Sequence, residues 1–327
     1  MKHAVPLLLI SLLSLVAVGC QQSGGTGKAP ESESPSSALS ASDEVRAEGL
    51  HNVYRITDRL FSGSSPDGEV GFRSLQKLGV RTVISVDGAR PDLDGAHKYG
   101  LRYVHLPIGY DGMSRQRALE LAKAVRDLPG PVYIHCHHGK HRGPAAAATV
   151  HLCLDQACSI ERAVAEMRRA GTDPRYTGLY ALPKTLARPT TQELDRIPAD
   201  FPEAAAVSDL AQIMVDIDTR WENLKRVQAA GWKTPPDHPD LDPPHEALQV
   251  VENYREAGRL KQTGERTEEF RRWLAAAEED TTKLERVLRP GTERGAPDRA
   301  AADEAFRKAG ASCVRCHAKY RDIPQQQ

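Results

Sequence analysis

The segment from residue 131 to residue 150 places one cysteine in a short loop between a strand and a helix. Apolar and aromatic residues at 132–134 predict a buried strand, and the alanine-rich run 144–150 predicts a helix. The residues between them are His135, Cys136, His137, His138, Gly139, Lys140, His141 and Arg142. Backbone N–H groups in such a loop, together with the N-terminus of the next helix, bind anions and lower the pKa of a cysteine thiol. Since Arg142 can hold a phosphate through two parallel hydrogen bonds, we expect a phosphate-binding loop with Cys136 as the nucleophile.

The spacing His-Cys-x5-Arg resembles the signature loop of the cysteine-dependent protein phosphatases, in particular the small dual-specificity type. The resemblance spans most of residues 49–188. It implies a phosphocysteine formed on Cys136, and it implies that His135 orients the loop and favours the thiolate. The residues implied to bind phosphate are His137, His138, Gly139, Lys140, His141 and Arg142. A buried cysteine in a histidine-rich turn is the alternative interpretation.

The reaction also needs an acid that protonates the leaving oxygen. The resemblance implies an aspartate on the loop after the preceding strand, and Asp111 stands there. A turn aspartate beside Gly112 is the alternative for Asp111, and Asp87 is the second candidate for the acid. The family usually has Ser or Thr after the loop arginine, whereas this chain has Gly143. This departure predicts slow hydrolysis of the phospho-enzyme, or a loop that only binds oxyanions.

The loop histidines and two further cysteines have less specific contexts. The loop histidines that raise the question of a metal are His137, His138 and His141. Three histidines within five loop residues rarely converge without strain, so the sequence disfavours a metal site built from them. We expect Cys153 and Cys158 to be small buried residues. A disulfide between them, or with an oxidised Cys136, is the alternative.

Strands alternate with helices across residues 49–188, which predicts an α/β domain with a mostly parallel sheet covered by helices on both faces. Predicted strands cover 81–86, 101–106 and 131–136, and predicted helices cover 66–78, 114–128, 144–154 and 159–170. The formal net charge is +0, so charge gives no argument for a nucleic-acid partner.

The N-terminus predicts export. The apolar run at 4–18 is too short for a comfortable membrane span and follows a basic start, which is typical of a signal peptide over 1–20. The small residues before Cys20 resemble a bacterial lipoprotein cleavage site, which implies lipidation of Cys20; a plain cleaved signal is the alternative. Residues 21–48 have little to bury and predict a flexible linker. The expected location is the periplasmic side of a bacterial membrane, held by a lipid anchor.

The C-terminal part predicts an all-α domain. Prolines and charges at 189–205 predict a linker, and apolar residues then recur at helical spacing in four stretches of 206–327. Short or proline-rich connections between these stretches predict an antiparallel four-helix bundle.

The last predicted helix contains the motif Cys-x-x-Cys-His, formed by Cys313, Cys316 and His317. This motif attaches c-type haem, with a zinc or dithiol site as the alternative. With the four helices it resembles the bundle-type cytochromes c of the c-prime and c556 kind. The resemblance implies one covalent haem c, with His317 as an iron ligand and Arg321 near the propionates. Met214 is the candidate for the sixth iron ligand; a core methionine beside an open iron site is the alternative.

These observations predict an exported haem c protein whose first domain hydrolyses phosphomonoesters of a protein or a small molecule. The alternative is an electron-transfer or gas-binding cytochrome whose phosphatase-like domain only binds an anionic partner. A phosphorylated substrate and a redox partner are implied, and a homodimer through the bundle is left open.

Overall fold

The structure of the chain is a computed structural model that describes residues 43–289 and 298–322. The predicted signal peptide, Cys20 and residues 21–42 of the predicted linker lie outside the described residues. No helix within the described ranges has the length and apolar character needed to cross a bilayer.

A six-stranded sheet in the order β1-β2-β3-β6-β4-β5 carries the phosphatase-like region. Its strands are β1 (Asp43–Ala47), β2 (Leu50–Arg55), β3 (Leu60–Ser64), β4 (Thr82–Ser85), β5 (Arg102–His105) and β6 (Val132–Cys136). Strands β3, β6, β4 and β5 pair in parallel, whereas β1, β2 and β3 pair antiparallel.

The sheet is therefore mixed rather than mostly parallel as predicted. The difference arises at its β1–β2–β3 edge, for which no strand was predicted. Strand β1 also begins inside the segment predicted as a flexible linker, where Val45 pairs with Val53 of β2. Its alternation of apolar and charged residues fits a half-buried edge strand, but the segment is too short to stand out from its polar surroundings.

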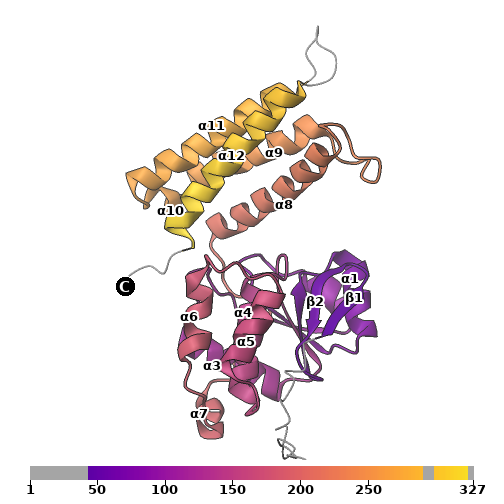
Figure 1. Cartoon of the computed structure of the whole chain (residues 1–327), viewed down its shortest axis with the longest axis vertical. Helices are drawn as coiled ribbons and strands as arrows, with labels where there is room; N and C mark the ends of the chain where they lie inside the picture. The colour runs from indigo at the N-terminus through magenta and orange to yellow at the C-terminus, as the bar shows by residue number, and fades with distance from the viewer. Residues whose placement is uncertain (1–42, 290–297, 323–327) are drawn as a thin grey trace, which may run out of the picture. The chain divides into compact units, whose positions relative to one another are not determined.

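Helices cover both faces of the sheet (Figure 1). They are α1 (Gly68–Lys77), α2 (Leu93–Lys98), α3 (Arg115–Asp127), α4 (Arg142–Leu154), α5 (Ile160–Arg169) and α6 (Thr177–Thr185). Residues of α3, α4, α5 and α6 share one core with Ile84 and Ile134, while α1 and α2 share another with Val83 and Tyr133. Successive strand residues thus face opposite cores, as the pleat requires. A short helix, α7 (Thr191–Arg196), lies in the predicted linker 189–205.

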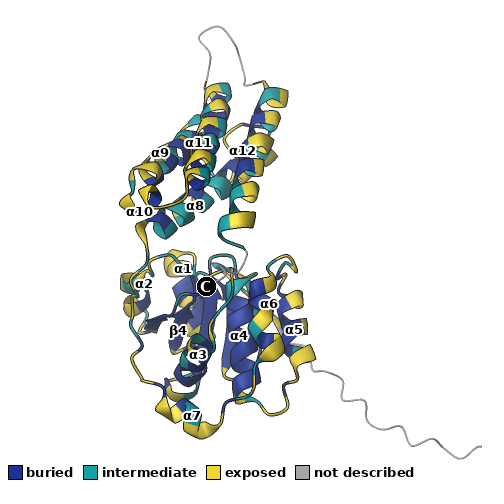
Figure 2. Ribbon diagram, turned by 90° about the vertical axis from the view of Figure 1, so that its left-hand side faces the viewer, coloured by how far each residue is buried: buried dark blue, intermediate teal, exposed yellow. Residues whose placement is uncertain are grey.

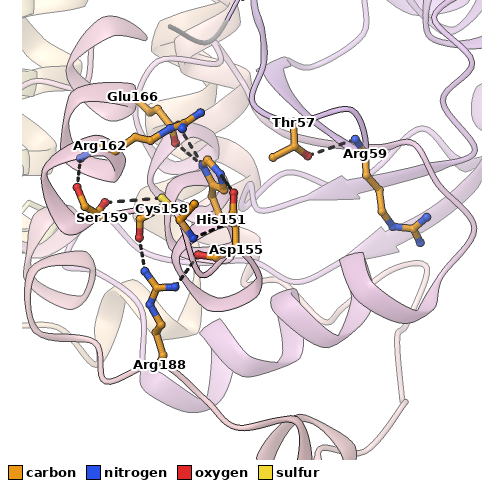
Figure 3. Close-up of polar contacts among 10 residues, drawn as sticks. Thr57, Arg59, His151, Asp155, Cys158, Ser159, Arg162, Glu166 and Arg188 are labelled. Carbon is orange, nitrogen blue, oxygen red and sulfur yellow. Dashed lines mark hydrogen bonds and ion pairs between the residues drawn. The ribbon is translucent and has the colours of Figure 1, made fainter. Parts of the chain in front are cut away.

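Helix α4 lies at the centre of one layer, and Figure 2 shows it buried along most of its length. Its alanines leave room for close packing against the strands and the neighbouring helices. At its far end, His151 Nδ1 lies 3.0 Å from Glu166 of α5, and His151 Nε2 lies 3.2 Å from Asp155 (Figure 3). Burial by itself lowers the pKa of His151, but hydrogen bonds with Cys158 and Glu166 and the charge of Glu166 raise it to about 10. The end of α4 away from the loop is therefore fixed by a charged, buried histidine.

The C-terminal region is helical. Its helices are α8 (Asp209–Ala229), α9 (Pro243–Arg259), α10 (Lys261–Gly264), α11 (Glu268–Leu288) and α12 (Arg299–Tyr320). Helix α9 packs against α8 and α11, and α11 packs against α12. Between α8 and α12, the ring of Trp221 stacks on that of Phe306 with centroids 4.3 Å apart. All four long helices contribute to one hydrophobic core.

Candidate active site

Cys136 ends strand β6 and is 3% exposed. Its neighbours in the sheet come from β3, where Ser64 is its register partner. Helix α4 begins at Arg142, so the loop between the cysteine and the arginine joins a parallel strand to a helix N-terminus. The first N–H groups of a helix have no partner within the helix, and the helix dipole favours an anion there. The cysteine, the loop and the helix end thus form the anion-binding arrangement that the sequence predicts.

The carbonyl groups of the loop face outward. The outward hydrogen bonds run from Ser65 N to His137 O (3.0 Å), from Asn52 Nδ2 to Gly139 O (2.8 Å) and from Thr172 Oγ1 to Lys140 O (2.8 Å). In a planar trans peptide the C=O and the following N–H point in opposite directions. The N–H groups of His138, Lys140 and His141 are therefore turned toward the inside of the loop, where a phosphate would accept from them.

Gly139 is the one loop position at which a side chain is excluded by two independent features. Its φ is 68°, in the left-handed region that glycine adopts at little cost. A Cβ at this position would lie 2.4 Å from Ser64 N, in the backbone of β3. Glycine thus lets the loop close against the end of β3.

Arg142 is held by a buried aspartate. Its Nη2 lies 3.0 Å from Asp87 Oδ1, and the two side chains are 11% and 4% exposed. The second oxygen of Asp87 accepts a hydrogen bond from the backbone N–H of His137. Nε of Arg142 is buried and has no hydrogen-bond partner among the described residues, so it is free to donate to an anion. The ion pair therefore orients the guanidinium while leaving one donor available.

These contacts argue against Asp87 as the general acid. Burial by itself raises the pKa of Asp87, but the charge of Arg142, with further contributions from nearby histidines, lowers it below its ordinary value. A carboxylate that stays ionised and accepts at both oxygens has no proton to give. It also takes up the N–H of His137, which is thereby removed from the predicted phosphate cradle.

The loop histidines diverge. Burial lowers the pKa of His135 to about 4, and its Nε2 pairs with the hydroxyl of Tyr103. Its neutral ring therefore adds no positive charge beside the thiol. His141 turns toward Tyr176, with ring centroids 4.8 Å apart, and its Nδ1 accepts from Asp173 N at 3.4 Å. His137 and His138 lie together instead, with ring centroids 4.4 Å apart.

Asp111 is exposed on the loop after β5 and lines the same cavity as Arg142. The cavity has a volume of about 410 Å³. The loop closes on itself through a bridge between Gly109 and Gly112. Asp111 thus faces the cavity that Arg142 also lines, and it is free of the ion pair that occupies Asp87.

Gly143 packs directly behind the cysteine. A Cβ at Gly143 would lie 3.5 Å from Cys136 Sγ and 3.1 Å from Cys136 N. A serine or threonine at this position would bring its hydroxyl beside the sulfur. Because this chain has glycine there, no hydroxyl from residue 143 lies beside the Cys136 sulfur.

The residues predicted to hold haem lie together. Cys313, Cys316 and His317 occupy one face of α12, and they line the same cavity as Met214 of α8 and Arg321. Four aromatic side chains also line this cavity: Tyr254, Phe270, Trp273 and Tyr320. Such a lining fits a flat, mostly apolar group attached through the two thiols. The five cysteines in the described part of the chain are free.

Two contributors to the site were not recognised in the sequence. Tyr110 contacts two arginines, with its ring centroid 4.8 Å from Cζ of Arg142 and 4.3 Å from Cζ of Arg321. Asp218 of α8 lies 3.1 Å from His138 Nε2. The pairing of Asp87 with Arg142 was missed as well, although an aspartate at the end of a neighbouring parallel strand is a usable signal.

No protein-family model matches the chain. Two dual-specificity protein phosphatases named TpbA, both from Pseudomonas aeruginosa, are similar in sequence. The protein from strain UCBPP-PA14 is 30% identical over 173 residues, which is 52% of this chain and 76% of the relative. The protein from strain PAO1 is 28% identical over 176 residues, with the same shares of 52% and 76%. The crystal structure of P. aeruginosa TpbA matches with 25% identity and a TM-score of 0.37, covering 42% of this chain and 86% of that one.

Proposed function

The chain belongs to the dual-specificity protein phosphatases, the family of TpbA, and from this premise we propose that it hydrolyses phosphomonoesters through a phosphocysteine on Cys136. The observation that carries the proposal is the loop itself. It brings together a buried cysteine, N–H groups turned inward and an oriented arginine with a free Nε, which are the donors that a phosphate needs.

In the first step, the thiolate of Cys136 attacks the phosphorus atom and the bond from phosphorus to the ester oxygen breaks. Arg142 and the loop N–H groups stabilise the charge that develops on the three phosphoryl oxygens. Asp111 gives its proton to the leaving oxygen, so that the product departs as an alcohol.

In the second step, water attacks the phosphocysteine. The Asp111 carboxylate accepts a proton from the water, the sulfur–phosphorus bond breaks, and the thiolate and inorganic phosphate are released. The substrate is a phosphorylated protein or small molecule.

Hydrolysis of an aryl phosphate under reducing conditions tests the proposal. Cys136→Ser should abolish turnover, because the hydroxyl is a far weaker nucleophile than the thiolate. Asp111→Asn should lower kcat by about 10²-fold, the usual effect of losing a general acid. Cys153→Ser is the matched control, since Cys153 is also buried but lies in α4 away from the loop, and it should keep full activity.

Mass spectrometry of enzyme quenched in denaturant tests for the phosphocysteine intermediate directly. A phosphoryl adduct on Cys136 is expected in the presence of substrate. Undiminished hydrolysis by Cys136→Ser would rule out the mechanism. If the unaltered chain hydrolyses nothing but binds vanadate in a way that requires Arg142, the domain only binds anions.

We propose a second function for the helical region, which is to hold one covalent haem c. The four long helices would form an antiparallel bundle, with thioether bonds to Cys313 and Cys316 and with His317 on the iron. Met214 would be the second iron ligand if the sixth position is filled. A haem in this place would supply one-electron transfer or the binding of small gases. The shared cavity and its aromatic lining support the proposal.

Co-expression with haem-maturation factors tests the haem proposal. The purified chain should show the absorption spectrum of a c-type haem that survives denaturation and acid–acetone extraction. The double variant Cys313→Ser/Cys316→Ser should lose it, while Cys153→Ser should retain it. Absence of covalent haem from the unaltered chain would contradict the proposal and would leave the phosphatase unaffected.

Export with a lipid anchor on Cys20 is proposed on the N-terminal sequence alone. Labelling of cells with a palmitate analogue should mark the unaltered chain. Cys20→Ser should remove the label and release the protein from the membrane fraction. A soluble periplasmic protein without label would support the plain signal peptide instead.

A further inference from the structure

Three ligating side chains meet beside the phosphate loop. His138 Nε2 lies 3.1 Å from Asp218 Oδ2, and His137 Nε2 lies 3.8 Å from the same oxygen. One ligand atom from each residue lies within 4.8 Å of the other two. Two of the residues come from the loop after β6, and the third comes from the middle of α8.

The separations fit a bound ion as well as they fit a pair of His–Asp ion pairs. Ligands about 2.0 Å from a tetrahedral Zn²⁺ lie about 3.3 Å from one another. The separations of 3.1 Å and 3.8 Å from Asp218 are close to this value, while ligand atoms up to 4.8 Å apart would have to approach when the ion binds. The contact of His137 with Asp218, at 3.8 Å, is within ion-pair distance but too long for a hydrogen bond, so a hydrogen bond holds only the ring of His138. An ion between the three would explain why both rings approach one oxygen.

The surroundings allow an ion to enter and to keep a free position. The side chains of His137, His138 and Asp218 are 28%, 39% and 46% exposed. All three line the cavity that Arg142 also lines. An ion held here would therefore have open coordination positions facing the cavity that Arg142 also lines.

We propose that His137, His138 and Asp218 bind one divalent transition-metal ion of the Zn²⁺ class, with its open coordination toward the phosphate loop. Imidazole and carboxylate ligands suit this class, and three protein ligands leave room for water or a phosphoryl oxygen. The sequence disfavoured a metal among the loop histidines because three of them cannot converge. The structure meets that objection, since His141 turns away and Asp218 supplies the third ligand.

Zn²⁺ titration of the purified full chain against a chromophoric chelator tests the site. One Zn²⁺ per chain is expected. His138→Ala and Asp218→Asn should each weaken binding by at least about tenfold, because even outer-shell partners of a metal site are worth that much. His141→Ala is the matched control from the same loop and should bind as the unaltered chain does. Circular dichroism should show that all variants fold.

The competing ligand set is the motif on α12. If Zn²⁺ binding is lost in Cys313→Ser/Cys316→Ser but unchanged in Asp218→Asn, the ion belongs to that motif and the proposal fails. No stoichiometric binding, or an equal loss in His141→Ala, would overturn it too. Since the readout is metal binding, an inactive phosphatase would not obscure the result.

Discussion

At the scale of single residues, the site depends on one buried ion pair. Removing one partner of a buried pair leaves the other charge uncompensated, whereas removing an exposed carboxylate costs little. Asp87 and Asp111 represent these two situations within one site. Their substitutions should therefore have different effects.

Asp87→Asn should destabilise the protein by about 3 kcal/mol and lower kcat/KM, because Arg142 loses its counter-charge and its fixed orientation. Asp111→Asn should leave the free energy of unfolding unchanged and lower only the activity. Urea unfolding and steady-state kinetics of both variants check this. Equal stability of the two variants would contradict the role given to the ion pair.

The same pair predicts a dependence on acid. Because the folded-state pKa of Asp87 is lowered, its contribution to stability is present above the ordinary carboxyl pKa of about 4 and is lost as the pH falls through the folded value. Unfolding measured between pH 3 and pH 6 should show this loss in the unaltered chain. Asp87→Asn should show less of it, and an identical pH profile would count against the assignment.

Substitutions of Gly143 test whether a hydroxyl beside Cys136 would speed turnover. Gly143→Ser and Gly143→Ala both add a Cβ near Cys136, so their difference isolates the hydroxyl. A hydrogen bond to a leaving thiolate is worth about 1.5–3 kcal/mol, so we expect turnover of the serine variant to exceed that of the alanine variant by about tenfold or more. Steady-state rates and the amplitude of the pre-steady-state burst test this. Equal turnover would show that breakdown of the phosphocysteine does not limit the reaction.

At the scale of elements, the sequence predicted helices α1, α3, α4 and α5, the long C-terminal helices and strands β4, β5 and β6, because their periodicity is strong. It did not predict helices α2 and α6 or the inner strand β3. Helix α3 was predicted at 114–128 and is observed at Arg115–Asp127. Strand β1 and helix α7 were missed because five or six residues are too few for a periodic signal, and both depend on neighbours that are distant in sequence. The antiparallel edge of the sheet was missed for the same reason.

The contact between His151 of α4 and Glu166 of α5 predicts that the protein loses stability at high pH. The pKa of His151 is raised to about 10, so its stabilising effect is complete below the ordinary histidine pKa and is lost as the pH rises toward 10. Between pH 7 and pH 10 the unaltered chain should lose on the order of 3 kcal/mol, since one pKa unit corresponds to about 1.4 kcal/mol. Urea unfolding should show a flatter profile for Glu166→Gln. Glu161→Gln, an exposed change on the same helix, should keep the profile of the unaltered chain.

At the scale of the whole molecule, the sequence predicted those parts of the site whose residues lie close together in the chain. The loop around Cys136 and the motif around Cys313 each lie within eight residues, so spacing alone identifies them. Asp218, and Arg321 stacked on Tyr110, join segments far apart in the chain. No local pattern states which segments meet, and these contacts therefore needed the structure.

The contacts of Tyr110 predict that Arg321, far away in the sequence, affects substrate binding at the phosphatase site. Its ring contacts both Arg142 of the loop and Arg321 after α12, and Nη2 of Arg321 also donates to the Tyr176 hydroxyl at 3.3 Å. A cation–π contact is worth about 0.5–2 kcal/mol, so Arg321→Ala should raise KM for an aryl phosphate by about twofold to thirtyfold as Tyr110 loosens. Arg315→Ala is the matched control, because Arg315 lies over Trp273 within the helical region. If both variants keep the KM of the unaltered chain, Arg321 has no influence on the phosphatase site. If only Arg321→Ala raises the KM, the contact of Arg321 with Tyr110 contributes to substrate binding.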